Sequence, residues 1–454
     1  MKFLKTNSIN IFIIAILATG ALLRANWYGD LRLSVAYKET ISYIRGSKAP
    51  LFSWEIFAGP RLFTTNLLFK AAQASDVSTC PLIAYGAPAY GQEAYRANQS
   101  CFNKIAVTQN ILAIVGWCFL AWSVSKSLQS PVIKIIAAIS ILVFGFTPQI
   151  AEWDSLLSPE SLTLSLFSIT LTLAIEIAFR ISRSDTPFKS KLEKGLITAW
   201  TIIFLLWIFV RDVHLYAIPL TLGLIAILFF IKKYRTSKYL LLNFVLLFIF
   251  FLIGFLSAKD SLRATHYPLI NALDEYIWPH PARIEFFQKY NMPERTSNLY
   301  QEWADANAAN AYGAFLITHP GFIATTLWEN LEQLNSDFVQ PFFFAPEVKN
   351  REVLLSIGEM FHPETSSFYV IDLFILLALI AQAIELRTPT ALSWAWLAIW
   401  FFAIASVTLL ISFFGDTIGL RRHIMPSVEM LRLFLWVFIM PLFDTPQKSA
   451  EIKS

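Results

Sequence analysis

The chain has 454 residues, of which 56% are hydrophobic and only 15% are charged, and its formal net charge is +4. A soluble globular protein would carry about 25% charged residues, so the composition excludes an ordinary soluble domain, and the small net charge gives no reason to expect a nucleic-acid partner. The apolar runs are each long enough to cross a ~30 Å hydrocarbon core as a helix. They predict an all-α polytopic membrane protein.

Hydropathy predicts about ten transmembrane helices. The segments are 9–23, 105–123, 132–147, 161–180, 195–210, 213–231, 239–257, 368–386, 391–412 and 424–442. They divide the chain into an N-terminal transmembrane core, 1–257, with a long first outer loop, 24–104, then a small helical region outside the membrane, 258–367, and C-terminal transmembrane helices, 368–454.

Basic residues gather on one side of these spans. Lys232, Lys233 and Arg235 fall together in one connection, whereas the short loops of the other side carry only Arg211, Arg421 and Arg422. The positive-inside rule then places both termini in the cytoplasm, in the inner or plasma membrane, and the two long segments outside. The start Met1 to Leu23 also fits a signal peptide, whose cleavage would leave the remaining topology unchanged.

The first outer loop opens with Gly29-Asp30, directly after the first span. Apolar residues recur at helical spacing in Leu31 to Ile44, which predicts a helix lying in the membrane interface, and a second such helix is expected near Phe57 to Ala72. A carboxylate at Asp30 could take a proton from an incoming hydroxyl at the membrane surface. The alternative is that Asp30 only caps the helix.

Cys80 and Cys101 share this first outer loop. An oxidising compartment would allow a disulfide between them, and two unpaired thiols are the alternative.

Other ionisable residues map to the same outer ends of spans. Asp154 and Glu160 come from one short loop, and Ser158-Pro159-Glu160 also fits a simple helix start. Arg211 is followed by Asp212, with which it could form a surface pair of little energetic value. Arg421, Arg422 and His423 precede the last span, where contact with lipid headgroups is the alternative. A site that deprotonates a hydroxyl and receives a departing phosphate needs both signs of charge.

With these residues in place, the chain resembles the membrane glycosyltransferases of the C superfamily, which include protein O-mannosyltransferases and the aminoarabinose transferase of lipid A. The resemblance rests on four short segments and on the order of the loops. The segments are Gly29-Asp30 with the residues after it, Leu156 to Leu162, Val210-Arg211-Asp212, and Gly415-Asp416 through Arg421-Arg422-His423 to Pro426. The family signature often pairs two acids, whereas Leu31 follows Asp30 here.

The resemblance implies an inverting glycosyltransferase that moves a sugar from a polyprenyl-phosphate donor to an acceptor hydroxyl or amine at the outer face. Asp30 would be the catalytic base, and Asp154 and Glu160 would orient the acceptor or an optional divalent cation. Arg211, Arg421, Arg422 and His423 would bind the donor phosphate. A transporter or flippase of lipid-linked sugars is the alternative, which would need charged or broken helices near the membrane midplane. Sugar, acceptor and oligomeric state do not follow from the sequence.

Overall fold

A computed structural model gives the fold of residues 2–37, 39–59, 61–74, 78–80, 82, 100–184, 187–263, 265–342 and 348–444. This described part is helical, and its only β-type pairing is an isolated parallel bridge between Val35 and Leu156. The longer helices are α1 (Lys2–Trp27), α5 (Asn103–Ser127), α6 (Pro131–Phe146), α8 (Pro159–Arg183), α9 (Lys191–Ile208), α10 (Ala217–Leu228), α11 (Lys238–Asp260), α19 (Ser367–Leu386), α20 (Pro389–Gly415) and α21 (Leu420–Phe438).

Shorter helices fill the two long loops and the turns. They are α2 (Thr40–Gly46), α3 (Glu55–Ala58), α4 (Phe63–Ala71), α7 (Pro148–Ala151), η1 (Glu152–Ser155), η2 (Asp212–Tyr216), η3 (Thr265–Leu269), α12 (Ile270–Tyr276), α13 (Pro281–Gln288), α14 (Tyr300–Trp303), η4 (Ala304–Ala308), α15 (Ala309–Thr318), α16 (Pro320–Glu329), α17 (Leu331–Leu334), α18 (Arg351–Phe361) and α22 (Met440–Phe443).

The prediction of an all-α polytopic membrane protein is confirmed. Among the described residues, seven helices are long and apolar enough to span a membrane, and the bent pair α6–α7 could make an eighth span. All ten predicted segments are helical, but the count of ten spans is not confirmed. The segment expected at 195–210 is α9, which is not among the seven, and the one expected at 213–231 is the shorter unit Asp212–Leu228.

Helix α8 lies inside the bundle, where α5, α9 and α20 pack against it. Small residues allow this close packing: a Cβ added at Gly116 of α5 would lie 2.4 Å from the Ser168 hydroxyl of α8. A Cβ at Gly145 of α6 would lie 2.3 Å from the Trp117 ring. Helix interfaces in membranes depend on such small residues, because lipid provides no hydrophobic force between helices.

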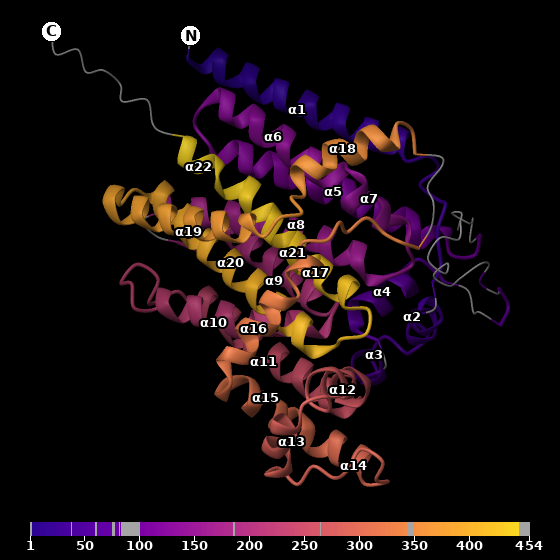
Figure 1. Ribbon diagram of the computed structural model, residues 1–454. Coiled ribbons are helices and arrows are strands. Elements are labelled where there is room, and N and C mark those ends of the chain that lie inside the picture. The colour runs from indigo at the N-terminus through magenta and orange to yellow at the C-terminus, as the bar shows by residue number, and fades with distance from the viewer. Residues whose placement is uncertain are drawn as a thin grey trace.

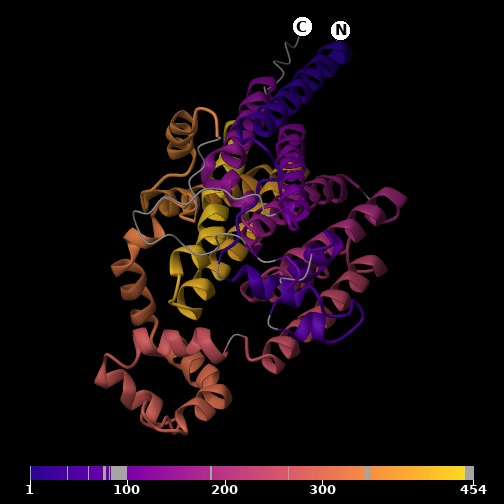
Figure 2. The same ribbon diagram turned by 90° about the vertical axis from the view of Figure 1, so that its right-hand side faces the viewer.

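The bundle has two distinct ends. The start of α1 and the end of α22 lie at one end in Figure 1, called here the terminal end, where Asp444 accepts hydrogen bonds from the backbone N–H groups of Gln129 and Ser130. The opposite end, called the site end, contains the last turn of α1 and the first turns of α8 and α21. Helices α12 to α15 form a lobe away from the terminal end (Figures 1 and 2).

The interfacial helix predicted from Leu31 to Ile44 is wrong in its first half. Residues 31–37 form turns and the bridge at Val35, and the helix α2 begins only at Thr40. Val35 N–H donates to Ser155 O (2.8 Å), and Leu157 N–H donates to Val35 O (2.9 Å). Pairing with a distant segment therefore decides the conformation here. The second predicted helix, Phe57 to Ala72, is interrupted after α3 and resumes as α4.

Candidate functional site

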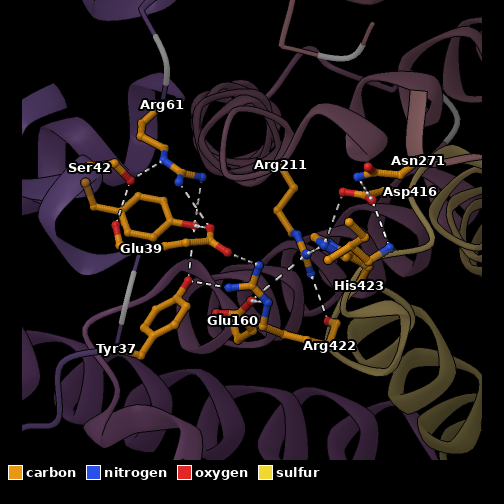
Figure 3. A network of polar contacts seen from close by, with 12 residues as sticks. Tyr37, Glu39, Ser42, Arg61, Glu160, Arg211, Asn271, Asp416, Arg422 and His423 are labelled. Atoms are coloured by element: carbon orange, nitrogen blue, oxygen red, sulfur yellow. Dashed lines mark hydrogen bonds and ion pairs between the residues drawn. The ribbon is translucent and has the colours of Figure 1, made fainter. Parts of the chain in front are cut away.

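Charged and polar side chains from five distant parts of the chain meet at the site end of the bundle (Figure 3). We call them the polar network: Tyr37, Glu39, Ser42, Arg61, Glu160, Arg211, Asn271, Asp416, Arg422 and His423.

The first outer loop enters the network because it is docked on the segment before α8. Besides the bridge at Val35, the Thr40 hydroxyl donates to Leu157 O (3.1 Å) and accepts from Tyr37 N–H (3.0 Å). These bonds hold the start of α2, and with it Glu39, beside the first turn of α8, which carries Glu160.

Glu160 lies in the middle of the network and is fully buried. Its Oε1 is 4.0 Å from Arg211 Nη2 and 3.8 Å from Arg422 Nε, which are ion-pair distances. Within the described part of the chain, neither carboxylate oxygen accepts a hydrogen bond. A buried carboxylate without hydrogen bonds costs folding free energy. Glu160 is therefore an acceptor with unused capacity between two cations.

Arg211 and Arg422 come from two different turns. Arg211 precedes η2 at the end of α9, and Arg422 lies in the first turn of α21, after Gly419 in a left-handed conformation (φ 71°) that favours glycine. Arg211 Nη2 donates to His423 Nδ1 (2.9 Å), and Arg211 Nη1 donates to Arg422 O (3.5 Å). The two guanidinium groups thus flank Glu160 and are tied to the same turn of α21.

Glu39 pairs with two arginines. Arg422 Nη2 is 2.6 Å from Glu39 Oε1, and Arg61 Nη2 is 3.1 Å from Glu39 Oε2. Burial alone would raise the pKa of Glu39, but Arg422 and Arg61 outweigh it and lower the pKa below its ordinary value. The Glu39 side chain keeps 25% of its surface exposed, so that solvent or a ligand can reach it. Arg422 also donates to the buried hydroxyl of Tyr37, whose pKa burial raises.

Asp416 joins the network to the lobe formed by α12 to α15. Its Oδ2 is 3.6 Å from His423 Nε2, and its Oδ1 accepts from Asn271 Nδ2 of α12 (3.0 Å). Burial raises the pKa of Asp416 in spite of the hydrogen bonds from Asn271 and from Ile418 N–H. Asp416 and His423 therefore connect α12 to Arg211 through a chain of polar contacts.

Of the residues singled out from the sequence, the structure brings Glu160, Arg211, Arg422 and His423 together. Arg421 instead donates to the backbone O of Asp337. The suggested surface pair of Arg211 with Asp212 is wrong, because Asp212 pairs with Arg263 (3.1 Å). Ser158 precedes α8 without a side-chain cap.

Asp30 and Asp154 lie in other contacts. Asp30 forms an ion pair with Arg32 (2.9 Å), in which the side chains are 39% and 69% exposed, and it begins a turn rather than capping a helix. Asp154 is buried against Arg24 (3.0 Å) and accepts from the Ser161 hydroxyl (2.6 Å). Their catalytic and orienting roles stay predictions.

Two further expectations concern cysteines and metals. The structure joins Cys80 and Cys101 in a disulfide, which was one of the two alternatives that the sequence left open. Among the described residues there is no group of three or more His, Cys, Asp or Glu side chains that could hold a metal ion.

Glu39, Arg61 and Tyr37 belong to the polar network but were not predicted from the sequence. Glu39 and Tyr37 lie within the stretch from Leu31 to Ile44, for which the sequence predicts an interfacial helix. Arg61 lies within the second predicted helix, Phe57 to Ala72. Residues 30–61 contain many basic and acidic residues, which is a pattern that could have pointed to a polar site. The ion-pair partner of each charged residue follows only from the packing of 33–37 on 155–158.

No family model and no curated protein matches the chain. Among solved structures it is similar to the archaeal oligosaccharyltransferase AglB from Archaeoglobus fulgidus in complex with an inhibitory peptide and a dolichol-phosphate (TM-score 0.46, 11% identity, 95% of this chain and 50% of that chain). It is also similar to the Archaeoglobus fulgidus oligosaccharyltransferase tethered with an acceptor peptide (0.44, 10%, 94% and 49%). The chain spans about half the length of these proteins. A similarity this low assigns no function to this chain.

Proposed function

We propose that this protein is an inverting glycosyltransferase, which moves a sugar from a polyprenyl-phosphate donor to an acceptor hydroxyl or amine at the outer face of the membrane. The observation that carries the proposal is the polar network: Arg61, Arg211 and Arg422 converge on Glu39 and Glu160 at one end of the membrane helices. Both termini are cytoplasmic in this proposal, which places the network at the outer leaflet.

The guanidinium groups suit the donor phosphate. Arginine binds phosphate through two parallel hydrogen bonds, and a lipid-anchored donor reaches the bundle at the depth of the lipid headgroups. Arg211 and Arg422 are both mostly buried, with 11% and 14% of their side chains exposed, and water screens their charge little. Glu160 acts as a positioning residue, because it holds the two arginines on either side of one carboxylate.

Glu39 suits the role of general base. The acceptor oxygen or nitrogen attacks the anomeric carbon, its proton passes to Glu39, and the bond from that carbon to the phosphate oxygen breaks, with the electron pair going to the lipid phosphate. That leaving group is already an anion, so the transfer needs no general acid, in contrast to glycoside hydrolysis. Asp30, the base that the sequence predicts, is the competing assignment.

Donor binding would also activate Glu39. Arg422 and Arg61 hold the pKa of Glu39 down while they pair with it, which makes it a weak base. A phosphate that takes hydrogen bonds from Arg422 weakens this pairing, so the pKa of Glu39 rises toward its ordinary value and its basicity increases. Proton removal then depends on the donor being in place.

The test is to incubate the purified full-length protein with a panel of polyprenyl-phosphate sugars and candidate acceptors and to measure release of the lipid phosphate. We expect release that requires one sugar donor and one acceptor class, and loss of release in Arg422→Gln. Failure of every donor in the panel to react, with folded protein, would count against the proposal.

The alternative function, a transporter or flippase of lipid-linked sugars, has one specific observation in its favour. Asp372 lies inside the candidate span α19, is fully buried, and in the described part of the chain neither of its oxygens has a hydrogen-bond partner. Buried acids within membrane spans often mark ion pathways. Sugar lipid that crosses the bilayer of proteoliposomes without loss of its phosphate would favour this alternative.

A further inference from the structure

A polar cavity lies at the terminal end of the bundle, at the opposite end of α8 from the polar network. Its volume is about 500 Å³. It is lined by Lys126 and Ser127 of α5, by Glu176, Phe179, Arg180, Arg183 and Ser184 at the end of α8, and by Glu193 of α9. The proposed transfer makes no use of it.

The cavity has positive charge in excess. Lys126 and Arg180 share one carboxylate, Glu176, at 3.2 Å and 3.5 Å. Arg183 lies over the ring of Phe179 (5.6 Å), and no described carboxylate pairs with it.

Two further observations show that, within the described part of the chain, the cavity has an unused hydrogen-bond donor and that one of its acids is partly engaged. Arg180 Nε is buried and, among the described residues, has no hydrogen-bond partner. Glu193 belongs to the capping box of α9, in which its carboxylate accepts from Ser190 N–H (3.4 Å). It is therefore partly engaged by the backbone. The cavity thus has the donors and the charge to bind an anion.

The cavity lies at the depth in the membrane at which lipid headgroups are found. Helices α5 and α8 each have 25 residues, about 37 Å at 1.5 Å per residue, which exceeds the ~30 Å hydrocarbon core. Lys126 and Ser127 end α5, and Arg180 and Arg183 lie in the last turn of α8. Basic pockets between membrane helices at this depth bind anionic lipid headgroups.

We propose that this cavity binds the phosphate headgroup of an anionic phospholipid from the leaflet at the terminal end, with Arg180, Arg183 and Lys126 as its contacts. The inference does not depend on the glycosyltransferase proposal, since it concerns the other end of the bundle. The bland alternative is that these basic residues only complement the dipoles at the ends of α5 and α8.

The test uses the full-length protein in detergent and measures binding of phosphatidylglycerol and phosphatidylcholine by native mass spectrometry. We expect phosphatidylglycerol to bind at least tenfold more tightly. Arg183→Gln removes an exposed side chain that forms no ion pair with a described residue, so the fold should survive, and it should weaken phosphatidylglycerol binding about fivefold. The double variant Arg180→Gln/Arg183→Gln should abolish the preference.

The matched control removes two cations from the turn between α10 and α11, which lies at the same end of the bundle and is exposed. Lys232→Gln/Arg235→Gln should keep the preference for phosphatidylglycerol. Equal binding of the two lipids by the wild type, or an equal loss in the control variant, would overturn the proposal. Competition by millimolar inorganic phosphate would assign the cavity to a soluble anion and would also overturn it.

Discussion

Two buried carboxylates in this protein have opposite surroundings. Glu429 of α21 has both oxygens in use, since Oε2 is 2.6 Å from His362 Nδ1 and Oε1 accepts from Arg432 Nη1 (2.6 Å). Arg432 in turn donates to Ser336 O (3.1 Å). Glu160 is equally buried and lies near two arginines, but it accepts no hydrogen bond among the described residues.

The difference separates a structural ion cluster from a candidate site. Burial of a charge is common to both, so burial alone does not indicate function. Both carboxylate oxygens of Glu429 are used within the protein, although Arg432 Nε has no hydrogen-bond partner among the described residues. In the polar network, both oxygens of Glu160 can still accept hydrogen bonds, and the neighbouring Glu39 is partly exposed. The Glu160 carboxylate can therefore accept hydrogen bonds that the described part of the protein does not supply.

The largest expected effect is on the free energy of unfolding, which should respond differently to substitution of Glu429 and of Glu160. Glu429→Gln leaves Arg432 buried without its counter-charge, which should destabilise the protein by about 3–5 kcal/mol. Glu160→Gln removes only ion pairs near 4 Å together with a buried charge, so the change should stay within about 1 kcal/mol. Thermal or denaturant unfolding of both variants in the same detergent checks this. Equal destabilisation would remove the distinction between the two clusters.

A second prediction compares neighbouring arginines on one turn. Arg422→Gln should lower turnover by about 10²–10³-fold, because a buried donor to the developing phosphate charge is lost. Among the described residues, Arg421 donates to the backbone O of Asp337 and forms no ion pair, so Arg421→Gln should change turnover less than threefold and serves as the control. The measurement is lipid-phosphate release at saturating donor. If Arg421→Gln matched Arg422→Gln, the donor would bind on the other side of α21.

A third, smaller effect is the pH dependence of stability. The folded-state pKa of Glu39 is lowered by Arg422 and Arg61 in spite of burial. Its stabilising contribution is therefore complete above the ordinary glutamate pKa, about 4.3, and is lost as pH falls through the lower folded-state pKa. The stability difference between the wild type and Glu39→Gln should shrink as pH falls from about 6 to about 3. A difference that grows on acidification would contradict the assigned pairing.

Much of the fold followed from the sequence, because helices in a membrane are specified by long apolar segments. The site was predicted only in part. Arg211, Arg422 and Glu160 lie next to span ends, and the alternating topology brings those ends together. Glu39 was missed because the apolar spacing in 31–44 imitates a helix, whereas pairing at Val35 with a segment more than a hundred residues away overrides it.

The sequence also did not predict which residues form ion pairs between distant segments. Asp154 was expected beside the acceptor, yet its partner Arg24 is 130 residues away, within the last turn of α1. Nothing in local composition specifies which cation reaches which carboxylate. That choice depends on the relative rotation of packed helices, which close contacts such as Gly116 against Ser168 determine.

The most direct test of the central claim is the rate of lipid-phosphate release by Glu39→Gln and Asp30→Asn, measured side by side with the reactive donor. General-base help is worth about 10²–10⁴-fold. The account predicts that Glu39→Gln loses at least about a hundredfold while Asp30→Asn stays within about threefold of the wild type. Wild-type turnover by Glu39→Gln, together with a collapse in Asp30→Asn, would contradict it and return the base to the aspartate that the sequence predicts.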